Sequence, residues 1–106
     1  MTPDREQFLY LTTRGRTSGE PREIEIWFTE RASLFYIIAE YPTAHWVQNI
    51  RAHSDVSVRV RDSAFAASAR VLDPQADAAL ILEVQVLSRE KYRWGEGLIV
   101  ELTPSN

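Results

Sequence analysis

Hydrophobic and polar residues alternate with a period of two along several short stretches of this chain. From Arg22 to Glu30, apolar side chains alternate with glutamates and a tryptophan. Such alternation is typical of a strand that buries one face. The pattern returns in Val56–Val60 and Phe65–Leu72, which we expect to pair as a hairpin. Leu34–Ala39 is instead apolar on both faces, which predicts a central strand covered on both sides.

Two stretches have helical spacing. Thr43–His53 is expected to be a helix because its apolar residues lie one turn apart. A second helix is expected over Asp73–Glu90, with Asp73 as N-cap and Pro74 as the first helical residue. Within this stretch, polar and apolar residues alternate over Leu82–Leu87, a pattern that fits a strand equally well. We expect a helix because the flanking residues keep helical spacing.

Two further strands, Phe8–Thr13 and Leu98–Leu102, complete the pattern. The sum is about six antiparallel strands and two helices, an α+β, mostly β barrel. A length of 106 residues favours one domain over residues 1–106. A chain this short buries only about two-thirds of the surface that its unfolded form exposes, so a partner would stabilise it. We therefore expect a homodimer in which the doubly apolar strand Leu34–Ala39 is covered by the second copy.

Composition excludes several classes of function. There is no cysteine, hence neither a disulfide framework nor a thiolate metal site, and we expect a cytoplasmic protein. No apolar run suggests a signal peptide or a membrane span. The net charge of −3 argues against a nucleic-acid partner. Locally, however, Arg14, Arg16 and Arg22 form a basic cluster between two strands.

That cluster lies in a polar turn whose composition suits an anionic ligand. Gly15 and Gly19 allow backbone N–H groups to approach a ligand closely. The hydroxyls of Thr17 and Ser18 can donate hydrogen bonds, and guanidinium groups match the geometry of phosphate. The turn therefore predicts a phosphate site, and the alternative interpretation is a solvated hairpin loop with incidental arginines.

The run TTRGRTSGEPR, from Thr12 to Arg22, followed by the strand IEIWF, resembles the signature of the deazaflavin-dependent nitroreductase and quinone-reductase family. The resemblance continues through the strand Leu34–Ala39, the Trp46-x-x-Asn49 pair, and the strands near Val56–Val60 and Ala69–Val71. It implies a split β-barrel of the pyridoxamine-phosphate-oxidase kind, and hydride transfer from reduced coenzyme F420, a deazaflavin, to a small flat acceptor such as a quinone or nitroaromatic.

The resemblance also implies roles for particular residues. Residues of the loop would grip the coenzyme phosphate: Arg14, Arg16, Thr17, Ser18 and Arg22. Trp46, Asn49 and the backbone near Ala39 would border the deazaflavin ring. No catalytic side chain is implied, because the coenzyme supplies the reactive group. This chain departs from the family pattern in having Thr17 where a lysine is usual, and in lacking the paired glycines usual near Glu40–His45.

Other residues leave alternatives open. His45, Asn49 and His53 lie four residues apart on one helical face, but asparagine is a poor metal ligand, so we expect no metal site. Trp27, Tyr92 and Trp94 are candidates for ligand or subunit contact. The leading function is a deazaflavin-dependent oxidoreductase. The alternatives are a barrel reductase that binds flavin mononucleotide (FMN) and a cofactor-binding module without turnover.

Overall fold

A computed structural model describes residues 6–105 of the chain. The backbone forms a sheet of seven strands with two helices, and every strand pairing is antiparallel. The elements in chain order are β1 (Phe8–Arg14), β2 (Pro21–Trp27), β3 (Thr29–Arg31), β4 (Leu34–Ala39), α1 (His45–Ala52), β5 (Asp55–Val60), β6 (Ser63–Val71), α2 (Ala78–Tyr92) and β7 (Leu98–Pro104). Within this described part, no helix is long and apolar enough to cross a membrane.

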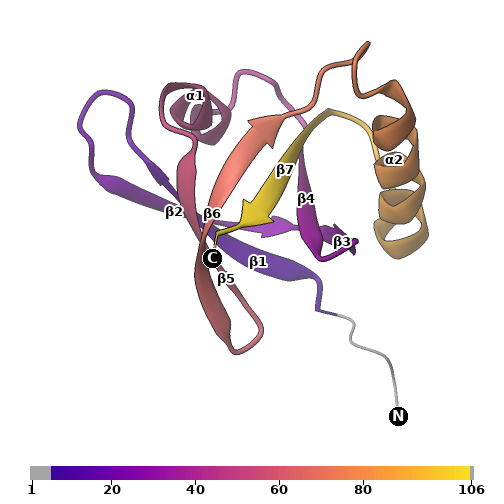
Figure 1. The fold of residues 1–106 in the computed structure, drawn as a ribbon, viewed down its shortest axis with the longest axis horizontal. Coiled ribbons are helices and arrows are strands. Elements are labelled where there is room, and N and C mark those ends of the chain that lie inside the picture. The colour runs from indigo at the N-terminus through magenta and orange to yellow at the C-terminus, as the bar shows by residue number, and fades with distance from the viewer. Residues whose placement is uncertain (1–5, 106) are drawn as a thin grey trace.

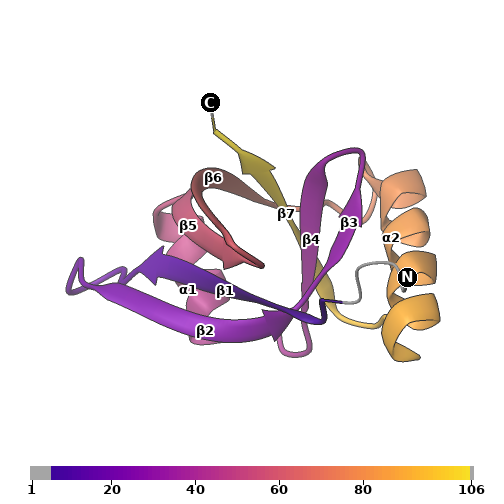
Figure 2. The same ribbon diagram turned by 90° about the horizontal axis from the view of Figure 1, so that it is seen from below.

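The sheet is curled into a partial barrel (Figure 1). Its strand order is β2-β1-β5-β6-β7-β4-β3, so the last strand in sequence, β7, lies between β6 and β4. Figure 2 shows α2 at one end of the molecule, beside β3 and β4, with α1 toward the other end. β5 and β6 pair as the expected hairpin, with Val58 opposite Phe65. The mostly β architecture expected from the alternation is confirmed.

The stretch Arg22–Glu30 is two strands, and its prediction as one strand is wrong. β2 and β3 lie at opposite ends of the strand order, and the chain turns between them at Phe28. The backbone N–H of Phe28 donates to the Tyr92 hydroxyl (3.0 Å), and its carbonyl accepts from Lys91 Nζ (2.9 Å). Side chains of α2 therefore satisfy the backbone groups that a continuous strand would have paired in the sheet.

Tyr92→Phe is expected to destabilise the protein by about 1–2 kcal/mol, because it leaves the N–H of Phe28 unpaired at a buried position. Urea unfolding monitored by circular dichroism measures the change. Tyr10→Phe is the matched control, since the Tyr10 hydroxyl bonds Glu25 on the exposed surface. Its expected cost is below about 0.5 kcal/mol. Equal losses in both variants would contradict a special role for the contact between Tyr92 and Phe28.

Both helices begin later than expected. α1 begins at His45 rather than Thr43, because Ala44 still has extended backbone angles. α2 begins at Ala78, although Leu82–Leu87 is helical as predicted. Asp73 accepts the N–H groups of residues 75 and 76, while Asp77 accepts the N–H of Asp73 and an Arg70 guanidinium. These bonds hold a separate turn before the helix, and they keep the pKa of both aspartates below the ordinary value.

The central strand β4 is covered on both faces within one chain. Phe35 and Ile37 lie in the barrel interior, together with residues of β1, β5 and β7. Tyr36 lies on the other face in a second cluster that includes Val84 of α2. The expectation of two covered faces is confirmed, but the reason given for dimerisation is wrong. The chain supplies the second cover itself, through α2.

Candidate functional site

The turn between β1 and β2 is a compact loop closed by its own backbone. The N–H of Gly15 donates to the carbonyl of Glu20, and the N–H of Gly19 donates to the carbonyl of Gly15, each at 2.8 Å. A side chain at Gly15 would lie 2.7 Å from Ser18 Oγ and 3.2 Å from the carbonyl oxygen of Glu20, so it would displace the Ser18 hydroxyl. Ser18 Oγ accepts a hydrogen bond from the backbone N–H of Glu20, so the Ser18 side chain is held inside the loop. The loop is therefore structurally defined before any ligand binds.

Asn49 of α1 forms hydrogen bonds with Thr13, near the end of β1, and with Arg16 of this loop. Its side chain is 4% exposed. Its amide oxygen accepts both the backbone N–H (3.2 Å) and the guanidinium (2.9 Å) of Arg16, and its amide nitrogen donates to Thr13 Oγ1 (3.1 Å). The structure thus places Asn49 under the loop, and these bonds fix the position of Arg16. Sequence reasoning did not identify Thr13, whose alternation with Leu9 and Leu11 was the available signal.

A cavity of about 430 Å³ lies over this loop, and we call it the loop pocket. Its lining is Thr13, Gly15, Arg16, Thr17, Ser18, Arg22, Ile24, His45, Trp46 and Asn49. No carboxylate is among these residues. Within residues 6–105, Arg22 has no ion pair, and the side chains that form hydrogen bonds with Arg16 are Asn49 and His45, neither of which carries a carboxylate. Two guanidinium groups without a neighbouring anion make this pocket suitable for a phosphate.

Arg14 lies elsewhere, so the structure does not bring all three arginines together. Side chains alternate along β1, and Thr13 is buried while Arg14 is exposed. Arg14 lines a different depression, which also includes Gly19, Pro21 and Asp55. The structure therefore places Arg14 outside the loop pocket, whereas Arg16, Thr17, Ser18 and Arg22 all line it.

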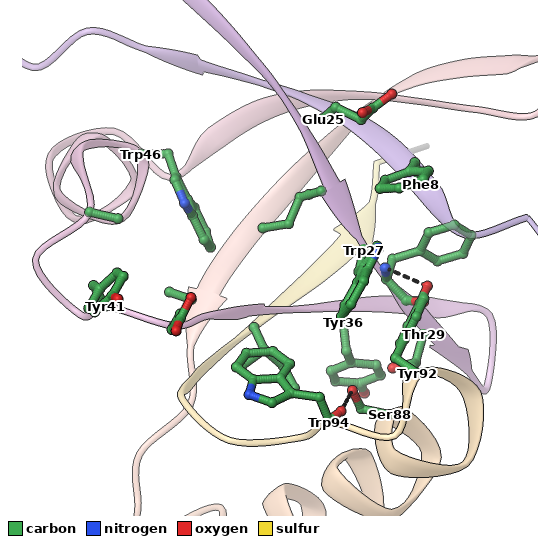
Figure 3. Close-up of a pocket in the computed structure, with 16 residues that line it drawn as sticks. Phe8, Glu25, Trp27, Thr29, Tyr36, Tyr41, Trp46, Ser88, Tyr92 and Trp94 are labelled. Atoms are coloured by element: carbon green, nitrogen blue, oxygen red, sulfur yellow. Dashed lines mark hydrogen bonds between the residues drawn. The ribbon is translucent and has the colours of Figure 1, made fainter.

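A second, larger cavity of about 620 Å³ lies between β2, β4 and the end of α2, and we call it the aromatic pocket. Figure 3 shows its aromatic side chains around a common space. The pocket is lined by Phe8, Glu25, Ile26, Trp27, Phe28, Thr29, Tyr36, Ile38, Ala39, Glu40, Tyr41, Ala44, Trp46, Ser88, Tyr92 and Trp94. Trp46 lines both cavities, so one residue belongs to the wall of the loop pocket and to the wall of the aromatic pocket.

The aromatic wall of this pocket is built from distant parts of the chain. The rings of Trp27 and Tyr92 stack with centroids 4.5 Å apart, and Trp94 meets Trp27 edge-on at 6.4 Å. These are the three aromatic residues that the sequence left as candidates for ligand or subunit contact. Burial of its ring raises the pKa of Tyr92 to about 12, so its hydroxyl stays protonated at neutral pH.

One polar group of the wall has no partner. The hydroxyl oxygen of Thr29 is buried, and no described residue forms a hydrogen bond with it. Buried polar atoms are nearly always hydrogen-bonded, so this hydroxyl is free to bond a water or a ligand. Ala39, predicted to border a ring, does line this pocket, whereas Asn49 lines only the loop pocket.

Comparison with known proteins gives one family. A family model described as F420H(2)-dependent quinone reductase matches residues 2–94, most of the chain. No curated protein gives a significant match.

Solved structures similar to this chain share its fold at low identity. An F420-H2-dependent reductase is 21% identical with a TM-score of 0.71, covering 92% of this chain and 93% of its own. The haem storage protein HutZ of Vibrio cholerae is 16% identical with a TM-score of 0.76, covering 95% and 83%. A putative pyridoxamine 5'-phosphate oxidase of Listeria innocua is 16% identical with a TM-score of 0.70, covering 96% and 86%. These likenesses confirm the split-barrel fold.

Proposed function

We propose that this chain, which belongs to the F420H(2)-dependent quinone reductase family and is a deazaflavin-dependent oxidoreductase, binds the phosphate of its coenzyme in the loop pocket and the coenzyme ring beside Trp46. The observation that carries this proposal is that Trp46 lines both the basic loop pocket and the aromatic pocket. A basic pocket and a mainly apolar pocket that share a wall residue match a ligand with an anionic tail and a flat ring.

The residues present fit that coenzyme. Arg16 and Arg22 would hold the phosphate, with Thr17 and loop N–H groups as further donors. When bound, the reduced deazaflavin supplies a hydride, and the chain supplies orientation and a dry, apolar environment. Asn49 would act indirectly, because its hydrogen bonds hold Arg16 in place.

For the acceptor we propose a small, flat quinone or nitroaromatic in the aromatic pocket. Its volume of about 620 Å³ is within the range typical of small-molecule sites. The stacked pair Trp27 and Tyr92 offers a flat apolar wall. The unpartnered hydroxyl of Thr29 is the group that would donate to an acceptor oxygen. We also propose a cytoplasmic location, on the ground that the sequence has no cysteine.

Parallel titrations with coenzyme F420 and FMN, followed by oxidation of reduced F420 by a naphthoquinone, test the proposed function. Tight binding of F420 with quinone-dependent oxidation is the expected result. Preference for FMN would favour the flavin-barrel alternative, and its bound form would be visible by absorbance. Binding of F420 without oxidation by any quinone or nitroaromatic would favour a binding module without turnover.

Thr17→Lys is expected to tighten coenzyme binding by about 0.5–1.5 kcal/mol, because it adds a cation to the exposed part of the loop pocket. Fluorescence titration at low and high salt measures the effect. The gain should shrink with salt, since exposed charges are screened over about 10 Å at ordinary ionic strength. An unchanged affinity at low salt would mean that position 17 does not face the phosphate.

We also propose a homodimer, which would form through exposed apolar residues and not through the covered strand β4. The exposed apolar residues Leu82 and Val86 form a stripe on α2, and Tyr41 and Trp27 are exposed beside the aromatic pocket. A solved structure with 22% identity is described as a domain-swapped dimer, which is a statement about that protein. Light scattering is expected to give twice the monomer mass, and Leu82→Glu with Val86→Glu is expected to halve it. A monomeric wild type would contradict the proposal.

A further inference from the structure

A histidine of the loop pocket has no role in the assignment above. His45 is the first residue of α1, and its ring nitrogen Nδ1 lies 3.2 Å from a guanidinium nitrogen of Arg16. A guanidinium group carries donors only, so Nδ1 must accept this hydrogen bond through its lone pair. The contact therefore requires a ring that is unprotonated at Nδ1.

The charged residues that line the loop pocket with His45 are all arginines. From the loop it faces Arg16, and across the pocket lies Arg22 of β2. No acidic side chain occupies the first turn of α1, so the positive end of this helix is also unopposed there. In the preceding segment, Glu40 and Tyr41 line the aromatic pocket, and neither lines the loop pocket. The residues that line the loop pocket therefore offer His45 no anionic partner.

We infer that His45 is a further ligand for the coenzyme's phosphate, and that it takes up a proton as the phosphate binds. An anion in the loop pocket draws the Arg16 guanidinium to itself and removes the need for Nδ1 to accept. It also offsets the positive charges that disfavour an imidazolium. A protonated His45 then donates to the phosphate as a third cation. This inference rests on the proposed function, because it presumes an anionic group in this pocket.

Linkage gives the direction of the pH dependence. A group that binds a proton more tightly in the complex strengthens binding at low pH, and this gain is lost as the pH rises past its titration range. Histidine titrates between about pH 5 and 8. We therefore expect the affinity for coenzyme F420 to fall about five- to tenfold between about pH 6 and 8.

Isothermal titration calorimetry of the intact protein with coenzyme F420, in two buffers of different ionisation enthalpy, counts the protons taken up. Titratable groups of the coenzyme contribute alike to wild type and variants, so the difference between proteins is the result. His45→Gln keeps a polar side chain beside Arg16, and we expect it to lower affinity at about pH 6 severalfold and to lose the additional proton uptake. His53→Gln is the matched control, because His53 ends the same helix and does not line the loop pocket.

The possible outcomes separate the two ideas. If wild type and His45→Gln bind coenzyme F420 with the same proton uptake and the same pH dependence, the inference is overturned while the proposed function stands. If His53→Gln removes the proton uptake instead, the inference is overturned as well. If wild type binds neither coenzyme F420 nor FMN at any pH, the proposed function fails, and the inference fails with it.

Discussion

Replacing Arg16 and Arg22 together by alanine is expected to weaken binding of coenzyme F420 at least about hundredfold. Each guanidinium group supplies a charge-assisted hydrogen bond worth about 1.5–3 kcal/mol, and each 1.4 kcal/mol is about a factor of ten. Each single substitution should therefore cost about tenfold or more. Calorimetry or fluorescence titration at physiological salt measures these losses. Both residues are exposed, so unfolding curves should change little.

Arg14→Ala provides the matched control for this double variant. It removes the same charge at the end of β1, next to the loop, but Arg14 lines a different depression from the loop pocket. We expect a loss within about threefold, because a charge that makes no contact acts only through a screened field. A loss as large as that of Arg16→Ala would mean that general positive charge, not the loop pocket, attracts the coenzyme. Unchanged affinity for coenzyme F420 in both Arg16→Ala and Arg22→Ala would mean that the loop is a solvated hairpin turn that does not bind the coenzyme.

Gly97→Ala is expected to destabilise the protein by about 3 kcal/mol. Gly97 has φ of +126°, a backbone conformation that side chains other than hydrogen rarely adopt. An added methyl group would overlap the carbonyl oxygen of Ala39 and approach the Ile38 side chain to 2.8 Å. Ala39 belongs to β4 and cannot move without disturbing its pairing with β7. Both the backbone strain and the steric overlap therefore lower the free energy of unfolding. Urea unfolding measures the change.

The matched glycine for this experiment is Gly19. It also has a positive φ, +76°, but nothing lies within 4 Å of an added side chain. Gly19→Ala should therefore cost only the backbone term, about 1 kcal/mol. Ala39 also lines the aromatic pocket, so Gly97→Ala is expected to weaken acceptor binding in the fraction that remains folded. Equal destabilisation by the two substitutions would contradict the steric argument.

Most strands, the hairpin of β5 with β6 and the polar turn between β1 and β2 were predictable from the sequence, because each depends on neighbours in the chain. Alternation located β5 and β6, an apolar run located β4, and all three, with β1 and β7, lie within one or two residues of the predicted bounds. The composition of the loop pointed to an anion for the same reason: glycines, hydroxyls and arginines lie within one turn of backbone. The family signature identified the kind of coenzyme.

Contacts between distant residues decided the rest. The break at Phe28 depends on Tyr92, 64 residues later, and nothing in the alternation of Arg22–Glu30 reveals it. The role of Asn49 depends on Thr13 and Arg16, more than 30 residues earlier. Arg14 and Arg16 are separated because Asn49 and His45 of α1 hold Arg16, whereas Arg14 ends β1 and lines a different depression. The aromatic pocket exists only because α2 packs on β4 and brings Tyr92 against Trp27. Local pattern determines which residues face inward, whereas packing determines which inward faces meet.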